Sequence, residues 1–408
     1  MSQRDQVVSD RMPIPGNRAL NKVQRSWAMR LSVLAKTVGC FTLFSFLALV
    51  PQRGDGASPA PLLKAKKEAE TKGYSFFATH EEIVTMAKKE EKLGVSSNLE
   101  PQNFKPLIHA FKQKYPFITD VQVGGELSGG AAYQRLILEM KAGQAKEWDV
   151  THIPLDFAQE YPPYLLKHDI LGMAKQGVLK IDPRMVSPVE RNMITITSNV
   201  SVILYNRKLI SDDKVPATWD DFLKPEFKGK KFLMNIRPLH LAGLVPAWGL
   251  ERTLDFARKL AAQQPVWGSG TTRLNTAVTA GEHSLYLASN FSSAKRAMSK
   301  DATGNLNYRV LEPIPTRIVE HTSAIINTAS HPHAALLWLE FLASPEGQEI
   351  IDKYEPLRAS VFTPGSATEQ VTRGKKLSVV DWNHFGKYQD YEAKIFVAWG
   401  FPKEDTRQ

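Results

Sequence analysis

Three short loops rich in glycine and serine are the segments of this sequence best suited to bind a small ligand. They are Ser96-Ser97-Asn98, Ser128-Gly129-Gly130 and Gly268-Ser269-Gly270-Thr271. Each lies between an expected strand and an expected helix, and the first turn of a helix leaves backbone N–H groups unpaired and partly positive. Such a turn binds anionic or polar groups, and glycine lets a ligand approach the backbone closely. A single loop of this kind is equally well explained by turn formation, but three together indicate a ligand site.

Two arginines are candidates for a charged contact with that ligand. Arg237 follows an expected strand over 231–236, and its planar fork of donors suits a carboxylate or a phosphonate. Arg273 lies in the first turn of an expected helix, where a cation is unfavourable for the helix dipole, so we interpret its position as a weak indication of ligand contact. The alternative for both is an ordinary surface arginine.

The elements that position these loops alternate between strand and helix. Thr79-His80-Glu81-Glu82 is a capping box that starts a helix, and apolar residues at 104, 107, 108, 111 and 115 form a stripe of helical period. Expected strands cover 93–95, 118–123, 148–150, Asn199–Asn206, 231–236, 284–288 and 322–327. This alternation predicts mostly parallel sheets with helices on both faces, where ligands bind beyond the carboxyl ends of the strands.

The N-terminal part of the sequence predicts export. The run TVGCFTLFSFLALV at 37–50 is uncharged, Arg30 and Lys36 precede it, and small residues follow it. This is the pattern of a secretory signal peptide and is too short for a comfortable membrane span, although an uncleaved anchor is the alternative. We expect residues 1–57 to be the signal peptide and an N-terminal extension, with Met29 as a candidate for the true start. Cys40 is the only cysteine and lies inside the run, so the mature chain is expected to have no lipid anchor and no disulfide.

Size and charge narrow the possible functions. Roughly 350 residues remain after the leader, which suits two lobes better than one core. Apolar residues make up 43% of the chain, as in a globular protein, and the formal charge of +10 lies partly in the leader. The remaining excess permits an anionic ligand but is weak support for nucleic-acid binding, and no zinc-ligand spacing or internal repeat is present.

Five motifs occur in a characteristic order. The motifs are the helix over 81–92 leading to Ser96-Ser97, the helix over 104–115, the stretch PATWDDFL at 216–223, the stretch TAVTAGE at 276–282, and HPHAA at 331–335 followed by FLASPEGQ at 341–348. Together they resemble the extracytoplasmic solute-binding proteins of bacterial ABC importers, in the branch that binds ferric iron or small organic solutes. The similarity covers roughly 79–400. Most of these residues have a scaffold role, so they identify the fold rather than the ligand.

The resemblance implies an α/β protein with the two-lobed type II periplasmic binding fold, a clamshell whose lobes are mostly parallel sheets flanked by helices. It implies a first lobe that combines 79–198 with 314–408, and a second lobe over 203–309. The Lys- and Ala-rich composition of 58–78 predicts a mobile entry segment before them. Crossing strands near 199–202 and 309–313 would form the hinge. The ligand would favour the closed state, which a membrane permease would recognise.

The resemblance also implies further site residues. The pair Tyr205-Asn206 matches one common in the family after the first crossing, and Asn199, Asn290, Glu320 and His321 fall where they can face the cleft. Ferric-binding members place two adjacent tyrosines where this chain has Asn290-Phe291, and a phenyl ring offers no donor atom to iron. The first loop also lacks the histidine of some iron binders. His331 and His333 flank a helix start and are expected to be solvated. We therefore expect no metal ligands and prefer a small organic or phosphorus-containing anion, or a small polar metabolite, with ferric iron as the alternative.

The resemblance implies two partners: a small-molecule ligand and, at the inner membrane, an ABC permease with its ATPase. We expect the chain itself to be a periplasmic monomer that needs no cofactor. An exported hydrolase is a rival class, but the sequence contains no Gly-x-Ser-x-Gly, His-Glu-x-x-His or comparable set, so no enzymatic activity is expected. A receptor that feeds a sensor instead of an importer is the remaining alternative, and the residues do not separate the two.

Overall fold

The computed structural model describes residues 60–99, 101–124, 130–355 and 357–401. The chain divides into a unit of residues 1–56 and a unit of residues 57–408, and every described residue belongs to the second. The expected signal peptide, with its apolar run at 37–50 and with Met29 and Cys40, lies outside the described residues. Among the helices that are described, none is long and apolar enough to span a membrane.

The first sheet has five strands in the order β2-β1-β3-β11-β4. The strands are β1 Lys92–Ser96, β2 Asp120–Gly124, β3 Val150–Ile153, β4 Met193–Thr195 and β11 Thr322–Ile325. β1 runs parallel to β2 and β3, whereas β11 runs antiparallel to β3 and β4. The carboxyl ends of β1, β2 and β3 therefore meet at one edge of the sheet, where the first two predicted loops begin.

The second sheet has seven strands in the order β12-β10-β5-β8-β6-β7, and β9 pairs with β5 outside this path. The strands are β5 Asn199–Asn206, β6 Leu233–Asn235, β7 Val266–Gly268, β8 Leu285–Asn290, β9 Leu306–Arg309, β10 Ile314–Arg317 and β12 Leu377–Val380. β6 is parallel to β7 and β8, and β5 is antiparallel to β8, β9 and β10. The sheet is thus mixed, and β5 is buried along its whole length, including the polar Asn199, Ser201 and Asn206.

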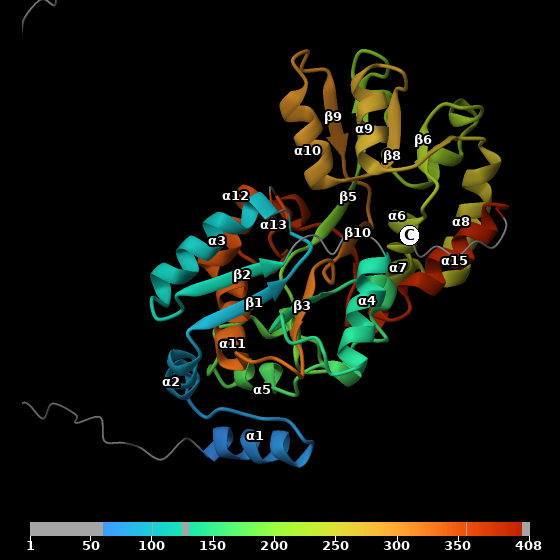
Figure 1. The fold of residues 1–408 in the computed structure, drawn as a ribbon. Coiled ribbons are helices and arrows are strands. Elements are labelled where there is room, and N and C mark those ends of the chain that lie inside the picture. The colour runs from blue at the N-terminus through green and yellow to red at the C-terminus, as the bar shows by residue number, and fades with distance from the viewer. Residues whose placement is uncertain (1–59, 100, 125–129, 356, 402–408) are drawn as a thin grey trace, which may run out of the picture. The chain divides into compact units, whose positions relative to one another are not determined.

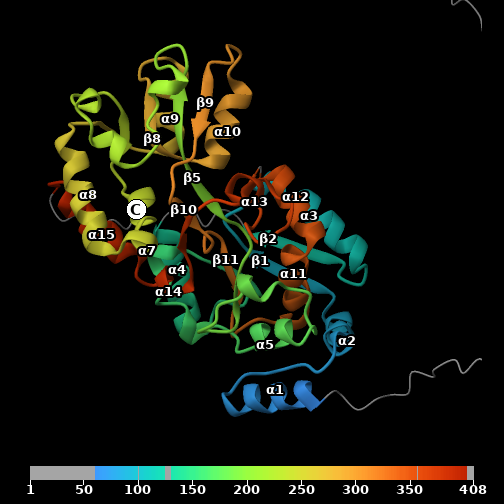
Figure 2. The ribbon, with the colours of Figure 1, turned by 180° about the vertical axis from the view of Figure 1, so that it is seen from behind.

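Helices cover the two sheets (Figures 1 and 2). They are α1 Ala60–Thr71, α2 His80–Glu90, α3 Pro101–Lys114, α4 Gly130–Lys141, α5 Ile170–Lys175, α6 Leu239–Ala242, α7 Val245–Trp248, α8 Leu250–Ala262, α9 Thr271–Thr279, α10 Phe291–Lys300, α11 Pro332–Ala343, α12 Pro345–Tyr354, α13 Ala367–Thr372, α14 Trp382–Phe385 and α15 Tyr388–Ala398. Both views place α3 and α11 with the first sheet and α9 and α10 with the second. α11 is apolar on all sides and almost wholly buried, as expected of a helix inside the core.

The sequence motifs form scaffold, as predicted. The hydroxyl of Thr79 accepts a hydrogen bond from the N–H of Glu82 at 3.2 Å and caps α2. In PATWDDFL, Asp221 accepts from the N–H of Thr218 at 2.8 Å, and the buried Trp219 donates its indole N–H to the carbonyl of Pro313 at 3.1 Å. Ser344 caps α12 by accepting from the N–H of Gly347. These contacts hold loops and helix ends in place and involve no ligand.

Two strands cross between the sheets and pair with each other. β4 of the first sheet leads into β5 of the second, and β10 of the second sheet leads back to β11 of the first. In the antiparallel β5–β10 pair, Asn199 lies opposite Arg317, and Val200 lies opposite Thr316. Figure 1 shows β5 and β10 where the two groups of elements meet. The connections between the sheets are residues 196–198 and 318–321, and the hinge that the resemblance implies near 199–202 and 309–313 stays a prediction.

The C-terminal stretch, which the resemblance assigns to the first lobe, contributes a strand to the second sheet and a helix beside it. β12 pairs in parallel with β10, so that Ile314 lies opposite Leu377, and α15 packs against α8 and α6 beside the second sheet. The buried Ile395 and Phe396 of α15 account for this docking, because an apolar helix face must bury itself against a neighbour. Local periodicity predicts such a helix but not the sheet that receives it. The lobe boundaries derived from the resemblance stay a prediction.

Candidate functional site

Two histidines lie side by side at the carboxyl edge of the first sheet. His152, in β3, and His321, just before β11, are both buried, and their ring centroids lie 4.5 Å apart. The Nδ1–H of His152 donates to the carbonyl of Thr322 at 3.1 Å, because a carbonyl only accepts. Its Nε2 is then the acceptor for the side-chain amide of Asn98 at 2.9 Å. The Nε2 of His321 lies 3.3 Å from the hydroxyl of Ser97. The first predicted loop is therefore anchored to this histidine pair.

Burial keeps both imidazoles uncharged. Desolvation lowers the pKa of His152 to about 4, and it lowers the pKa of His321 well below the ordinary value. The positive charge of Arg358 lowers both pKa values further. At neutral pH this edge therefore offers neutral hydrogen-bonding groups from Ser97, Asn98 and the two rings.

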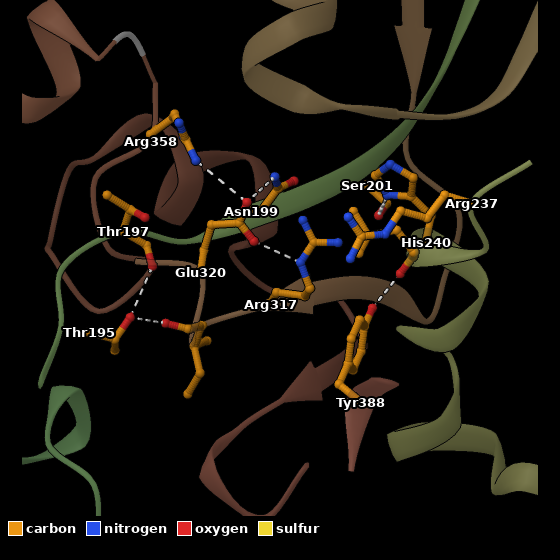
Figure 3. Close-up of polar contacts among 12 residues, drawn as sticks. Thr195, Thr197, Asn199, Ser201, Arg237, His240, Arg317, Glu320, Arg358 and Tyr388 are labelled. Atoms are coloured by element: carbon orange, nitrogen blue, oxygen red, sulfur yellow. Dashed lines mark hydrogen bonds and ion pairs between the residues drawn. The ribbon is translucent and has the colours of Figure 1, made fainter. Parts of the chain in front are cut away.

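A charged network ties the two crossing strands together (Figure 3). The buried Arg317 of β10 donates from Nε to Glu320 at 2.8 Å, and the side-chain amide of Asn199, at the start of β5, donates to the same carboxylate at 3.1 Å. Arg358 approaches Glu320 at 3.5 Å. Burial alone would raise the pKa of Glu320, but the two guanidinium groups outweigh it and hold the pKa at about 2. Glu320 also raises the pKa of Arg317, so the pair stays ionised.

On the second sheet, polar side chains gather around Ser201. The hydroxyl of Ser201, in β5, lies 2.6 Å from Nδ1 of His240, at the start of α6. His240 is buried, and desolvation lowers its pKa to about 3, so the ring is neutral; its Nε2 has no hydrogen-bond partner among the described residues. Asn290 lies opposite Ser201 on β8 and precedes α10 without capping it, and its Oδ1 is likewise buried without a partner. Buried polar atoms of this kind normally have a partner, so these two atoms can form hydrogen bonds with a ligand or a water molecule.

Arg237 connects segments that belong to both sheets. It follows β6, and its Nη2 lies 3.0 Å from Asp156, in the turn Leu155–Phe157 after β3, and 3.4 Å from Glu392 of α15. Burial raises the pKa of Glu392, while the two carboxylates raise the pKa of Arg237 against its own desolvation. The guanidinium is therefore engaged by two acidic side chains, one of them across the sheets.

The structure brings together some of the predicted site residues. Ser96, Ser97, Asn98, Asn199, Asn290, Glu320 and His321 lie at the first-sheet edge, at the crossing strands or at the end of β8 beside them. Gly130 begins α4, but Ser128 and Gly129 lie outside the described residues.

Other predicted residues lie elsewhere or are already engaged. Tyr205 is buried in the second sheet, where its hydroxyl donates to Asp212 at 2.9 Å and accepts from the amide of Asn307 at 2.7 Å. Ser269 and Arg273 are exposed around the start of α9, where Gly270 takes a left-handed backbone conformation (φ +83°) and Thr271 is half-buried. The loop at α9 thus keeps free N–H groups, whereas the ring of Tyr205 packs in the core.

Five polar residues at this site were missed from the sequence. They are His152, Ser201, His240, Arg317 and Arg358. His152 directly follows the expected strand over 148–150, and Ser201 lies near the start of the expected strand Asn199–Asn206, so the rule that ligands bind at strand ends could have found His152. The other three depend on long-range pairing: Arg358 reaches the crossing because its carbonyl accepts from the N–H of Ser198 at 3.1 Å, and local sequence contains no sign of that contact.

No group of three or more His, Cys, Asp or Glu side chains in metal-binding geometry occurs in the part of the chain that the structure describes.

Comparison with known proteins finds a sequence family and several solved structures that resemble this chain. Residues 168–387 match the sequence model of the bacterial extracellular solute-binding proteins. Among solved structures, the IdiA (FutA) protein of Trichodesmium in complex with iron and citrate has a TM-score of 0.59 at 19% identity and covers 76% of this chain and 100% of its own. The apo ferric ion-binding protein A of Pasteurella haemolytica has a TM-score of 0.59 at 15% identity and covers 77% and 100%. A structure described as a GABA receptor has a TM-score of 0.57 at 16% identity and covers 78% and 100%.

At these identities the likeness establishes the fold alone. It is that of the two-lobed type II periplasmic binding proteins, as the sequence predicted. The sheets are mixed and not mostly parallel as expected, because β5 and β11 run antiparallel to their neighbours. The neighbours are described with different ligands, an iron–citrate combination, ferric ion and GABA, so they do not assign one to this chain.

Proposed function

Because the chain belongs to the bacterial extracellular solute-binding protein family, we propose that it is the substrate-binding component of an ABC importer and captures a small organic or phosphorus-containing anion between its two sheets. The single observation that carries this proposal is that polar side chains from both sheets and their adjoining segments lie near the crossing strands. Asn98 and His152 come from the first sheet, and Ser201 and His240 come from the second.

The electrostatics of these groups support an anion held largely by neutral donors. The histidines are uncharged at neutral pH, and Glu320 is compensated by Arg317, so the charge of Glu320 does not oppose an anion. α9 and α10 both begin without a side-chain cap after β7 and β8, whose neighbour β6 runs parallel to both. The unpaired N–H groups of these helix starts add partial positive charge at the same edge.

Lobe closure is the proposed means of capture. The crossing strands β5 and β10 connect the sheets, and the ion pair between Asp156 and Arg237 joins their edges. A ligand that contacts both edges binds the closed state better than the open one, so it shifts the population toward closure by that difference in affinity. In the periplasm, the closed form would then bind a membrane permease and deliver the ligand to it. We expect no catalysis by this chain.

Ferric iron is the alternative ligand of the same fold. Most of the neighbouring structures are described as binding iron, which favours this candidate. At the end of β8, however, Asn290 offers an amide and Phe291 an apolar ring that contacts Tyr308 at a centroid distance of 5.4 Å. Neither side chain supplies the phenolate oxygen that a hard trivalent cation prefers.

Thermal denaturation separates these candidates. Protein purified after export from a bacterial host is screened with carboxylates, phosphonates, sugar phosphates, polyamines and ferric salts. A ligand present at about 100 times its Kd adds about 2.7 kcal/mol to the free energy of unfolding, an increase that a melting curve resolves. The proposal expects an increase with at least one anion. An increase in melting temperature with ferric salts alone, or with polyamines alone, would contradict the proposal that the ligand is an anion.

A further inference from the structure

Arg358 is the arginine that the fold places in the middle of the site. It lies in the segment after α12, where the carbonyl of Arg358 accepts from the N–H of Ser198 and Ala359 forms a bridge with Thr197. These backbone contacts fix Arg358 directly beside the start of β5. Figure 3 shows its side chain pointing toward Glu320 and Asn199.

The guanidinium of Arg358 is held loosely by its carboxylate neighbours. Its Nη2 lies 3.5 Å from Glu320, and its Nη1 lies 3.8 Å from Glu355, a separation too long for a hydrogen bond. Its side chain is 27% exposed, whereas that of Arg317 is 5% exposed and approaches Glu320 at 2.8 Å. A guanidinium has five N–H donors, and among the described residues the one hydrogen bond found for those of Arg358 is that of Nη2 to Glu320, so a ligand can bind the others.

Glu320 does not require Arg358 for its own compensation. Arg317 and the amide of Asn199 bind that carboxylate at 2.8 and 3.1 Å, both closer than Arg358. An incoming anion can therefore take the place of Glu320 on the Arg358 guanidinium without leaving a buried carboxylate unpaired. By contrast, Arg237 is engaged by Asp156 and Glu392, and Arg273 is exposed at the start of α9.

We infer that Arg358 binds the oxyanion of the transported solute, a carboxylate or a phosphonate or phosphate group, next to the His152–His321 pair. This inference rests on the proposed function and names the residue that gives it specificity for anions. The planar fork of arginine matches two oxygens of either group, and the neutral rings beside it do not compete for the anion. The influence of Arg358 on the pKa of both histidines indicates that its charge lies close to them.

The test compares binding of defined anions by the wild-type protein and three variants, each purified after export as above. Arg358→Gln removes the charge, Arg358→Lys keeps the charge but removes the fork, and Arg373→Gln removes an exposed arginine that pairs with Glu369 at 2.6 Å as a matched control. Calorimetry measures the affinity for acetate, succinate, inorganic phosphate and methylphosphonate, with glycerol as the neutral probe. The carboxylate and phosphorus probes distinguish the two oxyanion sources.

The inference expects the best anion of the wild-type protein to bind at least about tenfold more weakly to Arg358→Gln, since a hydrogen bond to a charged group is lost. The affinity of Arg358→Lys for the anion should lie between those of wild type and Arg358→Gln, and the affinity of Arg373→Gln should match that of wild type. In wild type, addition of the anion should shift the imidazole NMR signals of His152 and His321. In Arg358→Gln the same shift should require at least about tenfold more anion, whereas in Arg373→Gln it should occur at the wild-type concentration.

The possible failures are distinguishable. If wild type binds an anion and Arg358→Gln binds it equally well, the inference is wrong while the proposed function stands. If wild type binds none of the anions and responds only to ferric iron or polyamines, both are wrong. A matching melting temperature in the absence of ligand excludes misfolding of Arg358→Gln, and Arg358→Lys provides the comparison if that variant is unstable.

Discussion

The carboxylate of Asp156, which follows a strand of the first sheet, lies 3.0 Å from Nη2 of Arg237, which follows a strand of the second. The same guanidinium lies 3.4 Å from Glu392 of α15. The side chain of Asp156 is 17% exposed and that of Glu392 is 1% exposed. Because the two strands belong to different sheets, we expect opening of the site to break the Asp156–Arg237 contact and to leave Arg237 paired with Glu392.

Asp156→Asn is expected to favour the open state. It removes the charged contact between the sheets but leaves the Arg237–Glu392 pair intact, so the fold itself should be retained. Small-angle scattering of the ligand-free variant should give a larger radius of gyration than wild type. Asp255→Asn, which removes an exposed partner of Lys259 within α8, is the matched control and should leave the radius unchanged. Equal radii for Asp156→Asn and wild type would exclude a role of this ion pair in closure.

Tyr205→Phe is expected to lower stability without changing ligand affinity. The hydroxyl contacts Asp212 and Asn307 within the second sheet and its flanking turn, and its loss removes those two hydrogen bonds. Each is worth about 1 kcal/mol, so urea denaturation should show a modest decrease in the free energy of unfolding. A clear loss of solute affinity in this variant would instead support the sequence-based expectation that Tyr205 binds ligand.

Glu320→Gln is expected to destabilise the protein near neutral pH and much less in acid. The folded-state pKa of Glu320, about 2, lies below the ordinary value of 4.5. A depressed carboxylate pKa contributes stability that is present above pH 4.5 and is lost as the pH falls toward 2. The contribution is of the order of a few kcal/mol at pH 7. Urea denaturation at several pH values should show the difference between wild type and variant shrinking between pH 4.5 and 2; a difference independent of pH would contradict this account.

His240→Gln is expected to weaken the acid sensitivity of the fold. The folded-state pKa of His240, about 3, lies below the ordinary value of 6.5, so protons bind preferentially to the unfolded chain between these values. Each such group contributes a slope of up to about 1.4 kcal/mol per pH unit, and stability falls as the pH decreases from 6.5 toward 3. The slope for the variant over pH 6 to 4 should be smaller than for wild type. An unchanged slope would show that His240 is not buried as a neutral ring.

Much of the fold followed from local sequence patterns. The capping box at Thr79 predicted α2, and the β-prone run Asn199–Asn206 coincides with β5. The sequence did not predict β12, because this four-residue strand is formed by pairing with β10. The paired residues Ile314 and Leu377 are more than sixty positions apart in the sequence. The docking of α15 beside the second sheet depends on tertiary contacts in the same way.

The site followed the sequence less closely. Loops at strand ends could be predicted, and Ser97, Asn98 and Asn199 have polar contacts at the first-sheet edge and the crossing. The arginine that contacts the ligand could not be identified, because a sequence does not show which guanidinium groups already form ion pairs with acidic side chains. Arg237 was selected for its place after a strand, and the structure pairs it with Asp156 and Glu392, residues 81 and 155 positions away. Arg358 was overlooked because only its backbone contact with Ser198 brings it to the crossing.

Small-angle scattering of the exported protein, with and without the anion that most raises its melting temperature, tests the central claim most directly. The account predicts that the radius of gyration decreases when the anion binds, because the ligand bridges the two sheet edges and shifts the population toward the closed state. Identical scattering curves with and without every anion that binds would contradict capture by closure.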